Sequence, residues 1–301
     1  MSKQITPKEN IERGKLVSEG KTKKIYEVAG DPKYAIVEYK NTITAFDDPT
    51  FTKEFATKAK YSNITTSRVF EMLQKAGIPT SFVRQLSDTE FLAEKCDMIP
   101  LEVVVRRYAF GSYLKRHPEY ARAEGATPHR FDTPTVEFFL KTTKGGVKDS
   151  HGEVIVEGLD PLKGEEDPFI ENPEDSMWRL AHPKKPDSDP TASLQRTIEG
   201  ARVLGSGTTK EMESMIVKTL TTLEEFFSKH DFKLIDFKIE FGVTKDGKVV
   251  IADVIDNDSW RLRDKDWNDV SKQSFRDGGG MSDIEDKYAL VAALLETSRA
   301  S

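Results

Sequence analysis

Strict alternation of apolar and charged residues in one short segment constrains the fold of this chain more than any other feature. In IDFKIEF, at 235–241, every second residue is apolar and the three between them are charged. Successive side chains of a strand point to opposite faces of a sheet, so one face of this strand belongs to a core and the other carries charge. Further along, Asp246-Gly247 separates this run from VVIADVID and predicts a β-hairpin.

The predicted hairpin brings two carboxylates together. With a two-residue turn at Asp246-Gly247, Glu240 falls directly opposite Asp253. Like charges at opposed positions destabilise a sheet by up to about 1 kcal/mol unless a cation offsets them. Oxygen ligands without His or Cys favour Mg²⁺, and Lys238 on the same face could reach a further anion. The alternative, which the spacing supports equally, is a solvated face on which the two acids lie apart in water.

Composition excludes two classes of partner. The 301 residues carry a formal net charge of −6, and Lys and Arg are interspersed among the acids, so no basic face indicates nucleic acid or a lipid surface. The N-terminus lacks the apolar segment of a secretion signal, and no stretch approaches the ~18 apolar residues of a membrane span. We therefore expect a cytoplasmic protein of about two domains that meets anionic ligands with local clusters of cations.

The chain has a single cysteine, Cys96. One cysteine excludes an internal disulfide and a multi-cysteine zinc site. No His and no Gly-rich elbow accompanies it in FLAEKCDMIP, so we expect a buried structural thiol and not a nucleophile.

Turn signals divide the chain into a β-rich first part and a mixed second part. The first part has predicted strands over 15–40, a helix over 52–76 that ends at Gly77, and strands in SFVRQLS and TEFLAEKC. The second part has a strand in LEVVVRRYAFG, a helix over 112–122, a strand in TVEFFLK, a polar tract over 142–194 expected to be loop with a hairpin at EVIVEG, a helix over 208–230 and a helix over 283–296. Because DMIP interrupts the run of strands with a proline, we place a boundary near Asp97 to Pro100, with a β-rich lobe over 1–98 and an α+β lobe over 99–301.

Two segments place cations where phosphate could bind. In EGKTKKIYE, Gly20, Lys21 and Lys23 stand in a tight turn whose N–H and ammonium groups could hold polyphosphate. In LEVVVRRYAFGS, Arg106 ends an apolar strand and Ser112 begins a predicted helix, a combination that binds phosphate monoesters. The alternatives are an exposed basic hairpin for the first segment and surface salt bridges for the second.

Arg261, among acids in DSWRLRD, could likewise bind phosphate or form a surface salt bridge.

Taken together, these segments resemble the phosphoribosylaminoimidazole-succinocarboxamide synthase (SAICAR synthetase) family of de novo purine synthesis. The resemblance covers most of the chain through EGKTKKIYE, AGIPT, MIPLEVVVRRYAFGS, LIDFKIEFG, ADVIDNDSWRL and KQSFRD. The MIPLE to GS block and the DFKIEFG block are specific signatures of that family. The sequence departs from it at Phe110, where a small Thr or Ala is expected, and in the tract over 144–194, which is longer than the family needs.

The resemblance implies an ATP-dependent ligase that joins L-aspartate to the carboxylate of carboxyaminoimidazole ribonucleotide (CAIR) and releases ADP and phosphate. It implies an α+β fold of two lobes, the first resembling the small lobe of a kinase, with ATP in the cleft between them. The partners would be these small molecules, with no nucleic acid and no membrane, and a homo-oligomer would be compatible with the family.

Carried over position by position, the site of the family falls on residues of both lobes. The nucleotide phosphates would meet Gly20, Lys21 and Lys23, and the adenine would lie against the segment from Glu94 to Met98. The other implied members are Glu240 and Asp253 for Mg²⁺, Arg106, Ser112 and Arg261 for the ribonucleotide 5′-phosphate, Lys238 and Asp236 to orient the reacting groups, and Asp47, Lys58, Asn63 and Arg276 elsewhere in the substrate site.

Two other functions fit the same residues. A small-molecule kinase would use a kinase-like lobe and Mg²⁺ carboxylates equally well, but it would release a stable phosphorylated product without needing aspartate. A non-catalytic nucleotide-binding module would be favoured if the two carboxylates lay apart in water.

Overall fold

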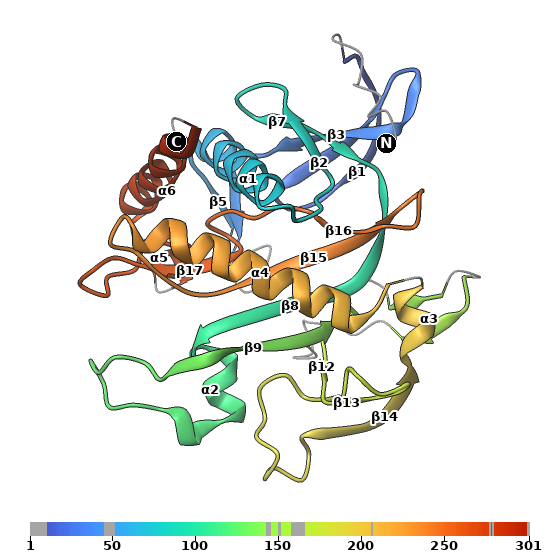
Figure 1. The fold of residues 1–301 in the computed structure, drawn as a ribbon, viewed down its shortest axis with the longest axis vertical. Helices are drawn as coiled ribbons and strands as arrows, with labels where there is room; N and C mark the ends of the chain where they lie inside the picture. The colour runs from blue at the N-terminus through green and yellow to red at the C-terminus, as the bar shows by residue number, and fades with distance from the viewer. Residues whose placement is uncertain are drawn as a thin grey trace.

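The computed structural model shows an α+β protein built on two larger antiparallel sheets, which confirms the predicted fold class (Figure 1). The structure describes residues 11–44, 52–142, 146–149, 152–157, 166–205, 207–276, 278 and 280–299.

The first sheet comes from the N-terminal third of the chain, where β-prone runs are separated by tight turns. Its strand order is β1-β2-β3-β7-β6. The helix α1 packs on it through Val69, Phe70 and Leu73 and ends beside Gly77, whose φ of +72° makes it the expected helix terminator. The elements are β1 (Arg13–Glu19), β2 (Lys23–Val28), β3 (Asp31–Tyr39), β6 (Phe82–Gln85), β7 (Glu90–Glu94) and α1 (Lys58–Lys75). The helix begins six residues later than predicted because β4 (Thr42–Thr44) pairs with β5 (Thr52–Glu54).

The second sheet has β8 and β15 at its centre. Its order is β14-β13-β12-β9-β8-β15-β16, and β17 pairs with the other half of β15. The strands are β8 (Cys96–Tyr108), β9 (Arg130–Leu140), β12 (Phe169–Ile170), β13 (Met177–Ala181), β14 (Ser193–Glu199), β15 (Lys233–Thr244), β16 (Val249–Ala252) and β17 (Trp260–Arg263). The remaining elements are α2 (Ser112–Arg116), the 3₁₀ turn η2 (Pro118–Tyr120), β10 (Val147–Lys148), β11 (Val154–Val156), α3 (Gly200–Leu204), α4 (Thr209–Ser228), α5 (Gln273–Arg276), α6 (Met281–Glu296) and η4 (Thr297–Arg299).

The boundary predicted at Pro100 falls inside β8. That strand runs from Cys96 to Tyr108 and does not begin after the proline as expected. The pairing of β8 with β15 shifts between Glu240 and Gly242, so an irregularity in the ladder accommodates the residue that lacks an N–H. A continuous strand therefore joins the two parts of the chain, and their division into two lobes stays a prediction.

The polar tract is more ordered than predicted. The hairpin at EVIVEG is confirmed in part, because β11 pairs with β10. The expectation of loop was wrong for β12, β13 and β14, which extend the second sheet beyond β9. Their residues lack a clean alternation, and only pairing of β12 with β9, of β13 with β12 and of β14 with β13 reveals them as strands.

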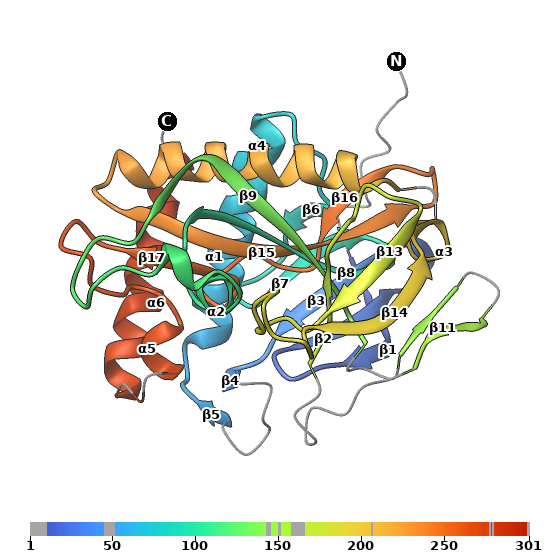
Figure 2. The same ribbon diagram turned by 90° about the horizontal axis from the view of Figure 1, so that it is seen from below.

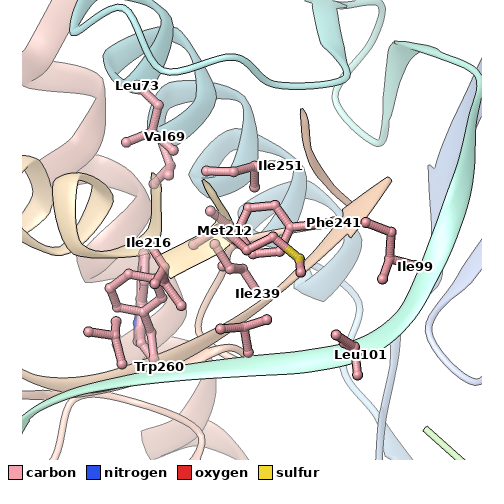
Figure 3. Close-up of a cluster of buried hydrophobic side chains, with 14 of the residues drawn as sticks. Val69, Leu73, Ile99, Leu101, Met212, Ile216, Ile239, Phe241, Ile251 and Trp260 are labelled. Carbon is pink, nitrogen blue, oxygen red and sulfur yellow. The ribbon is translucent and has the colours of Figure 1, made fainter. Parts of the chain in front are cut away.

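One face of the second sheet is closed by α4. Its apolar residues, including Met212, Ile216 and Phe227, pack against the alternate residues of β15 and β8 (Figure 3). Burial of such a side chain contributes about 1.5–3 kcal/mol. Figure 2 shows α4 along one side of this sheet and the strands of the first sheet on the other side. The opposite, charged face of β15 is thereby left for the site.

The hairpin of β15 and β16 differs from the prediction by one residue. Its loop has three residues, because the Thr244 N–H donates to Lys248 O at 2.9 Å and Gly247 takes a φ of +76°. Ala252, and not Asp253, lies opposite Glu240. The predicted register was wrong because a two-residue turn was assumed at Asp246-Gly247.

Candidate active site

The charged face of the second sheet gathers residues from three neighbouring strands. Asp236, Lys238 and Glu240 alternate along β15, as the sequence predicts. In the ladder, Asp236 pairs with Arg106 of β8 and with Arg261 of β17, while Glu240 pairs with Glu102 of β8. Residues that the sequence separates by more than 100 positions therefore share one surface.

Glu240 and Asp253 are close despite the shifted register. Asp253 follows the last residue of β16 and has a φ of +63°, which ends the alternation of the strand. Burial raises the pKa of Glu240 and the charge of Asp253 raises it further, although Lys141 opposes this by donating to Glu240. Within the described ranges no third Asp, Glu, His or Cys joins them in a group that could hold a metal. The site thus offers two carboxylates that repel one another and lie among lysines.

Lys23 joins the first sheet to this pair. Its Nζ donates to Asp253 Oδ1, and Glu240 and Asp256 also lie near enough to act on it. Burial lowers the pKa of Lys23, but these carboxylates outweigh burial, so the pKa is raised overall. Lys23 is thus held as a cation beside two acids of the other sheet.

The Gly20-Lys21 turn is closed by its own hydrogen bonds. Gly20 N–H donates to Lys23 O at 2.8 Å, and the Thr42 hydroxyl donates to Lys21 O. The Gly20 N–H that the sequence offered to a phosphate is therefore engaged within the turn.

The predicted phosphate-binding residues converge. Arg106 donates from Nη1 to Asp236 Oδ2 at 2.6 Å and from Nη2 to Ser112 Oγ at 3.3 Å. Arg261 donates to the same Asp236 Oδ2 at 2.6 Å, and its guanidinium lies 5.2 Å from the centre of the Phe110 ring. Arg106 is buried with 3% of its side chain exposed, whereas Arg261 is 20% exposed. Arg261 is therefore the member that solvent, and hence a ligand, can reach.

Lys238 is the most exposed cation of the face. Its side chain is 46% exposed, and Nζ donates to Glu102 Oε2 at 2.6 Å. The backbone N–H of Lys238 donates to Ser259 O at 3.0 Å, which ties β15 to the turn before β17.

A buried ionic cluster stands behind the site. Asp258 lies 3.3 Å from Lys58 Nζ and 3.2 Å from Lys272 Nζ, and it accepts from the hydroxyl of Tyr288 in α6. Burial opposes the charge of Asp258, but the two lysines and Tyr288 lower its pKa overall. Lys58 is fully buried in this cluster, so its amine is turned toward Asp258.

Asp256 has a separate, local contact. Its Oδ1 accepts from the Asp258 N–H at 2.8 Å and so closes the turn after Asp253. Burial raises its pKa, and the charge of Asp258 adds to this. The sequence indicated no role for Asp256 and Asp258, and in the structure both acids make contacts within the protein.

The other predicted members lie in different settings. Asn63 directs its amide to Ser87 O at 2.9 Å, against the turn between β6 and β7. Glu94 ends β7, and Met98 lies in β8 with 45% exposure, so one residue separates the two strands at the predicted adenine segment. Asp47 lies outside the described residues, and Arg276 is the last residue of α5, where only the backbone is described. Their roles stay predictions.

Cys96 is half-buried rather than fully buried. Burial raises the pKa of its thiol to about 11, and the neighbouring acids add to this. The thiol is thus a poor nucleophile at neutral pH, as expected.

Sequence reasoning missed three charged contributors to this face. Lys141, Glu102 and Glu137 each pair with a residue of the site, respectively Glu240, Lys238 and Arg106. Alternation along TVEFFLK and LEVVVRR could have indicated that the two acids point away from the apolar face of the sheet. Only the order of the strands brings Glu102 to Lys238 of β15 and Glu137 to Arg106 of β8.

Comparison with known proteins identifies the family of the chain. A model of the SAICAR synthetase family matches residues 16–159 and 176–292. A phosphoribosylaminoimidazole-succinocarboxamide synthase of Chloroflexus aggregans is 36% identical over 296 residues, covering 94% of this chain and 96% of that one. The multifunctional protein ADE2 of Gallus gallus is 36% identical over 281 residues, which cover 89% of this chain and 53% of that protein.

Solved structures show the same fold. A SAICAR synthetase in complex with ADP has a TM-score of 0.68 at 28% identity, covering 92% of this chain and 96% of that one. A phosphoribosylaminoimidazole-succinocarboxamide synthase of Ehrlichia chaffeensis also has a TM-score of 0.68, at 25% identity, covering 94% and 98% of the two chains.

The named relatives and the fold shared with solved SAICAR synthetases identify an enzyme of the ATP-dependent ligase class. The chain belongs to the SAICAR synthetase family. None of the helices that the structure describes is both long and apolar enough to cross a membrane.

Proposed function

We propose that this chain ligates L-aspartate to the carboxylate of CAIR, with ATP as co-substrate, and forms SAICAR, ADP and phosphate in the cytoplasm. The observation that carries the proposal is the row of cations along the charged face of β15, with Lys23 at Asp253, Lys238 at Glu102 and Arg261 at Asp236. Three anionic substrates have to meet in such a site, and fixed cations offset their mutual repulsion.

The chemistry explains why ATP is needed. A carboxylate is a poor acyl donor, so the γ-phosphoryl group is transferred to the CAIR carboxylate and gives an acyl phosphate. The amine of aspartate then attacks the carbonyl carbon, and phosphate leaves. Lys238 is suited to orient the reacting anions because its side chain, on the charged face of β15, is about half exposed. Asp236 contributes by accepting hydrogen bonds from two arginines and so holding them in place.

The donor set fits Mg²⁺. Glu240 has a raised pKa because of burial and Asp253, so a divalent cation between these acids would relieve an existing repulsion. Glu240 and Asp253 would hold the ion, which takes one or two protein carboxylates and fills its remaining positions with water and phosphate. When bound, it supplies positive charge to the nucleotide phosphates.

We assign the substrates to positions on the same surface. Arg261 and Ser112, supported by Arg106, bind the 5′-phosphate of the ribonucleotide. The nucleotide phosphates lie near Gly20, Lys21 and Lys23, and the adenine lies against Glu94 to Met98. Further substrate contacts are assigned to Asp47 and Arg276, whereas Lys58 and Asn63, which are fully buried, would support the site from behind.

Omission of each substrate in turn tests the reaction. We expect ADP release and SAICAR formation only when ATP, CAIR and aspartate are all present with Mg²⁺. Undiminished ADP release into a stable phosphorylated product without aspartate would identify a kinase instead. Nucleotide binding without any ADP release under the complete conditions would identify a binding module.

A further inference from the structure

Five charged side chains form one continuous buried line that ends at the site. Arg116 of α2 pairs with Glu137 Oε1, and Arg106 Nε donates to the other oxygen, Glu137 Oε2. Arg106 and Arg261 then share Asp236 Oδ2, each at 2.6 Å. Arginine and carboxylate side chains thus alternate along the line, from Arg116 in α2 to the partly exposed Arg261.

The line carries an excess of positive charge. Its three guanidinium groups contact two carboxylates, so one positive charge has no carboxylate in contact, although Asp187 and Glu102 attract Arg116 and Arg106 from further away. Arg106, Arg116, Glu137 and Asp236 are each at most 5% exposed, so water solvates only the Arg261 end. Because an uncompensated buried charge is costly, the excess is best compensated by an anion that docks at Arg261.

Glu137 controls how Arg106 is aimed. By accepting from Nε it fixes the plane of the guanidinium, so that Nη1 points to Asp236 and to Phe110 O while Nη2 points to Ser112 Oγ. The guanidinium is planar and its N–H groups are fixed relative to one another, so a bond at Nε also fixes the directions of Nη1 and Nη2.

Arg116 is itself held by the polar tract. Its guanidinium lies 4.6 Å from the centre of the Phe169 ring in β12, and Nη1 donates to the carbonyl of Pro183. The strands that sequence analysis missed therefore support the first link of the line.

We propose that Arg116 and Glu137 are positioning residues for the ribonucleotide phosphate, acting through Arg106 and Asp236 on Arg261. The assignment rests on the proposed function, since it concerns the same phosphate. Neither residue reaches the reacting atoms. Their contribution is to hold the charged line, and with it Arg261, in register for the phosphate.

The test is Glu137→Gln, which keeps the shape and removes the charge. We expect the KM for CAIR to rise about 10-fold, with kcat and the KM values for ATP and aspartate within about twofold of wild type, because Arg106 loses the carboxylate that fixes the plane of its guanidinium and this outweighs the added positive charge. Equal changes in all three KM values, or a fall in kcat at unchanged KM for CAIR, would overturn the proposal.

Two further variants separate positioning from mere folding. Arg116→Met alone should also raise the KM for CAIR, and combining it with Glu137→Gln restores the charge balance, so the double variant should be less impaired than the product of the single effects. A double variant whose rise in the KM for CAIR equals the product of the two single rises would contradict a shared line. If Glu137→Gln does not fold, Arg116→Lys gives the same test, with an unchanged KM for CAIR counting against the proposal.

A matched pair on the same strand provides the control. Arg107 donates from Nε and Nη2 to Glu224 of α4, both at 2.8 Å, and has no link to Arg261 in the described contacts. Glu224→Gln makes the same chemical change and should leave every KM unaltered; an equal rise in the KM for CAIR would show that any lost Arg–Glu pair has this effect. Wild-type protein that forms no SAICAR would refute the proposed function, whereas active wild type with an unaffected Glu137→Gln refutes only this inference.

Discussion

Asp253 shows how a single backbone conformation serves the site. Its φ of +63° lies in the left-handed region, which Asp tolerates better than most residues. The conformation ends β16 and presents the carboxylate to Lys23 of the first sheet. A carboxylate placed here is available to Mg²⁺ and also links the two sheets.

Asp253→Asn should reduce turnover at least about 100-fold, because the metal would lose one of two charged ligands and several kcal/mol of charge stabilisation. Circular dichroism should show an unchanged fold. Asp246→Asn, in the exposed turn of the same hairpin, is the control and should retain activity. Near-normal turnover of Asp253→Asn with Mg²⁺ would contradict the metal assignment.

Glu240 should destabilise the ligand-free protein at neutral pH. Burial and the charge of Asp253 raise its pKa in the folded state, so the folded state binds this proton more tightly than the unfolded state. The contribution of Glu240 to stability is therefore present below its ordinary pKa of about 4.3 and is lost as the pH rises through the raised value.

Glu240→Gln should accordingly raise the melting temperature at pH 7, and the gain should vanish toward about pH 4, while activity is lost. Melting curves across this pH range, without ligands, measure it. Glu225→Gln is the control, since a hydrogen bond from Lys229 lowers the pKa of that exposed acid and no gain at pH 7 is expected. A lower melting temperature for Glu240→Gln at pH 7 would refute the argument.

At the scale of elements, the junction between β8 and α2 shapes the phosphate region. Gly111 has φ +60° and ψ −130°, a conformation that glycine alone adopts readily. A Cβ added there would lie 2.6 Å from Arg261 Nη2, so the absence of a side chain is what admits the arginine. The predicted helix over 112–122 was too long: α2 ends at Arg116, and η2 follows after His117.

Gly111→Ala should raise the KM for CAIR by about 10-fold or more, because the new methyl group displaces Arg261 and its charge-assisted bonds. Gly125→Ala is the matched control: Gly125 has a φ of +76° but no atom within 4 Å of an added Cβ. The control should lower the melting temperature through backbone strain and leave the KM for CAIR unchanged. Equal kinetic effects of both substitutions would remove the steric explanation.

At the scale of the whole molecule, one core joins the two sheets. Phe91 of β7, Phe70 of α1, Leu101 of β8 and Ile216 of α4 belong to the same buried cluster. A backbone hydrogen bond links the two sheets as well. The N–H of Ser81, in the segment before β6, donates to Ile251 O of β16 at 2.8 Å. The largest core is therefore shared by the two sheets, and only a smaller cluster of Val28, Tyr34, Ile36 and Leu92 belongs to the first sheet alone.

We therefore expect a single cooperative unfolding transition. The three tryptophans, Trp178, Trp260 and Trp267, all follow β8, so their fluorescence monitors the second sheet, whereas far-UV circular dichroism monitors the whole chain. The two signals should coincide in urea. Phe91→Ala, a change in the first sheet that costs about 3–5 kcal/mol, should shift both equally; a shift in circular dichroism alone would indicate separate domains.

The fold class and most elements follow from local sequence, because alternation and turn residues act over a few positions. The strands of the first sheet, the helix at 208–230 and the charged face of β15 were all predicted in this way. The resemblance to a known family, carried by the MIPLE to GS and DFKIEFG blocks, indicated the site residues that periodicity alone left ambiguous.

Tertiary structure decided what depends on pairing between distant strands. One extra residue in the turn at 245–247 moved Ala252 opposite Glu240, and no local pattern distinguishes the two turns. The strands β12 to β14 exist because β9 offers an edge to pair with. The sequence by itself determined which residues carry charge and on which face of β15 they lie, since strand period is a local property. Only the packed sheets decided which charges meet, because the line from Arg116 to Arg261 crosses five elements whose order is set by burial of a shared core.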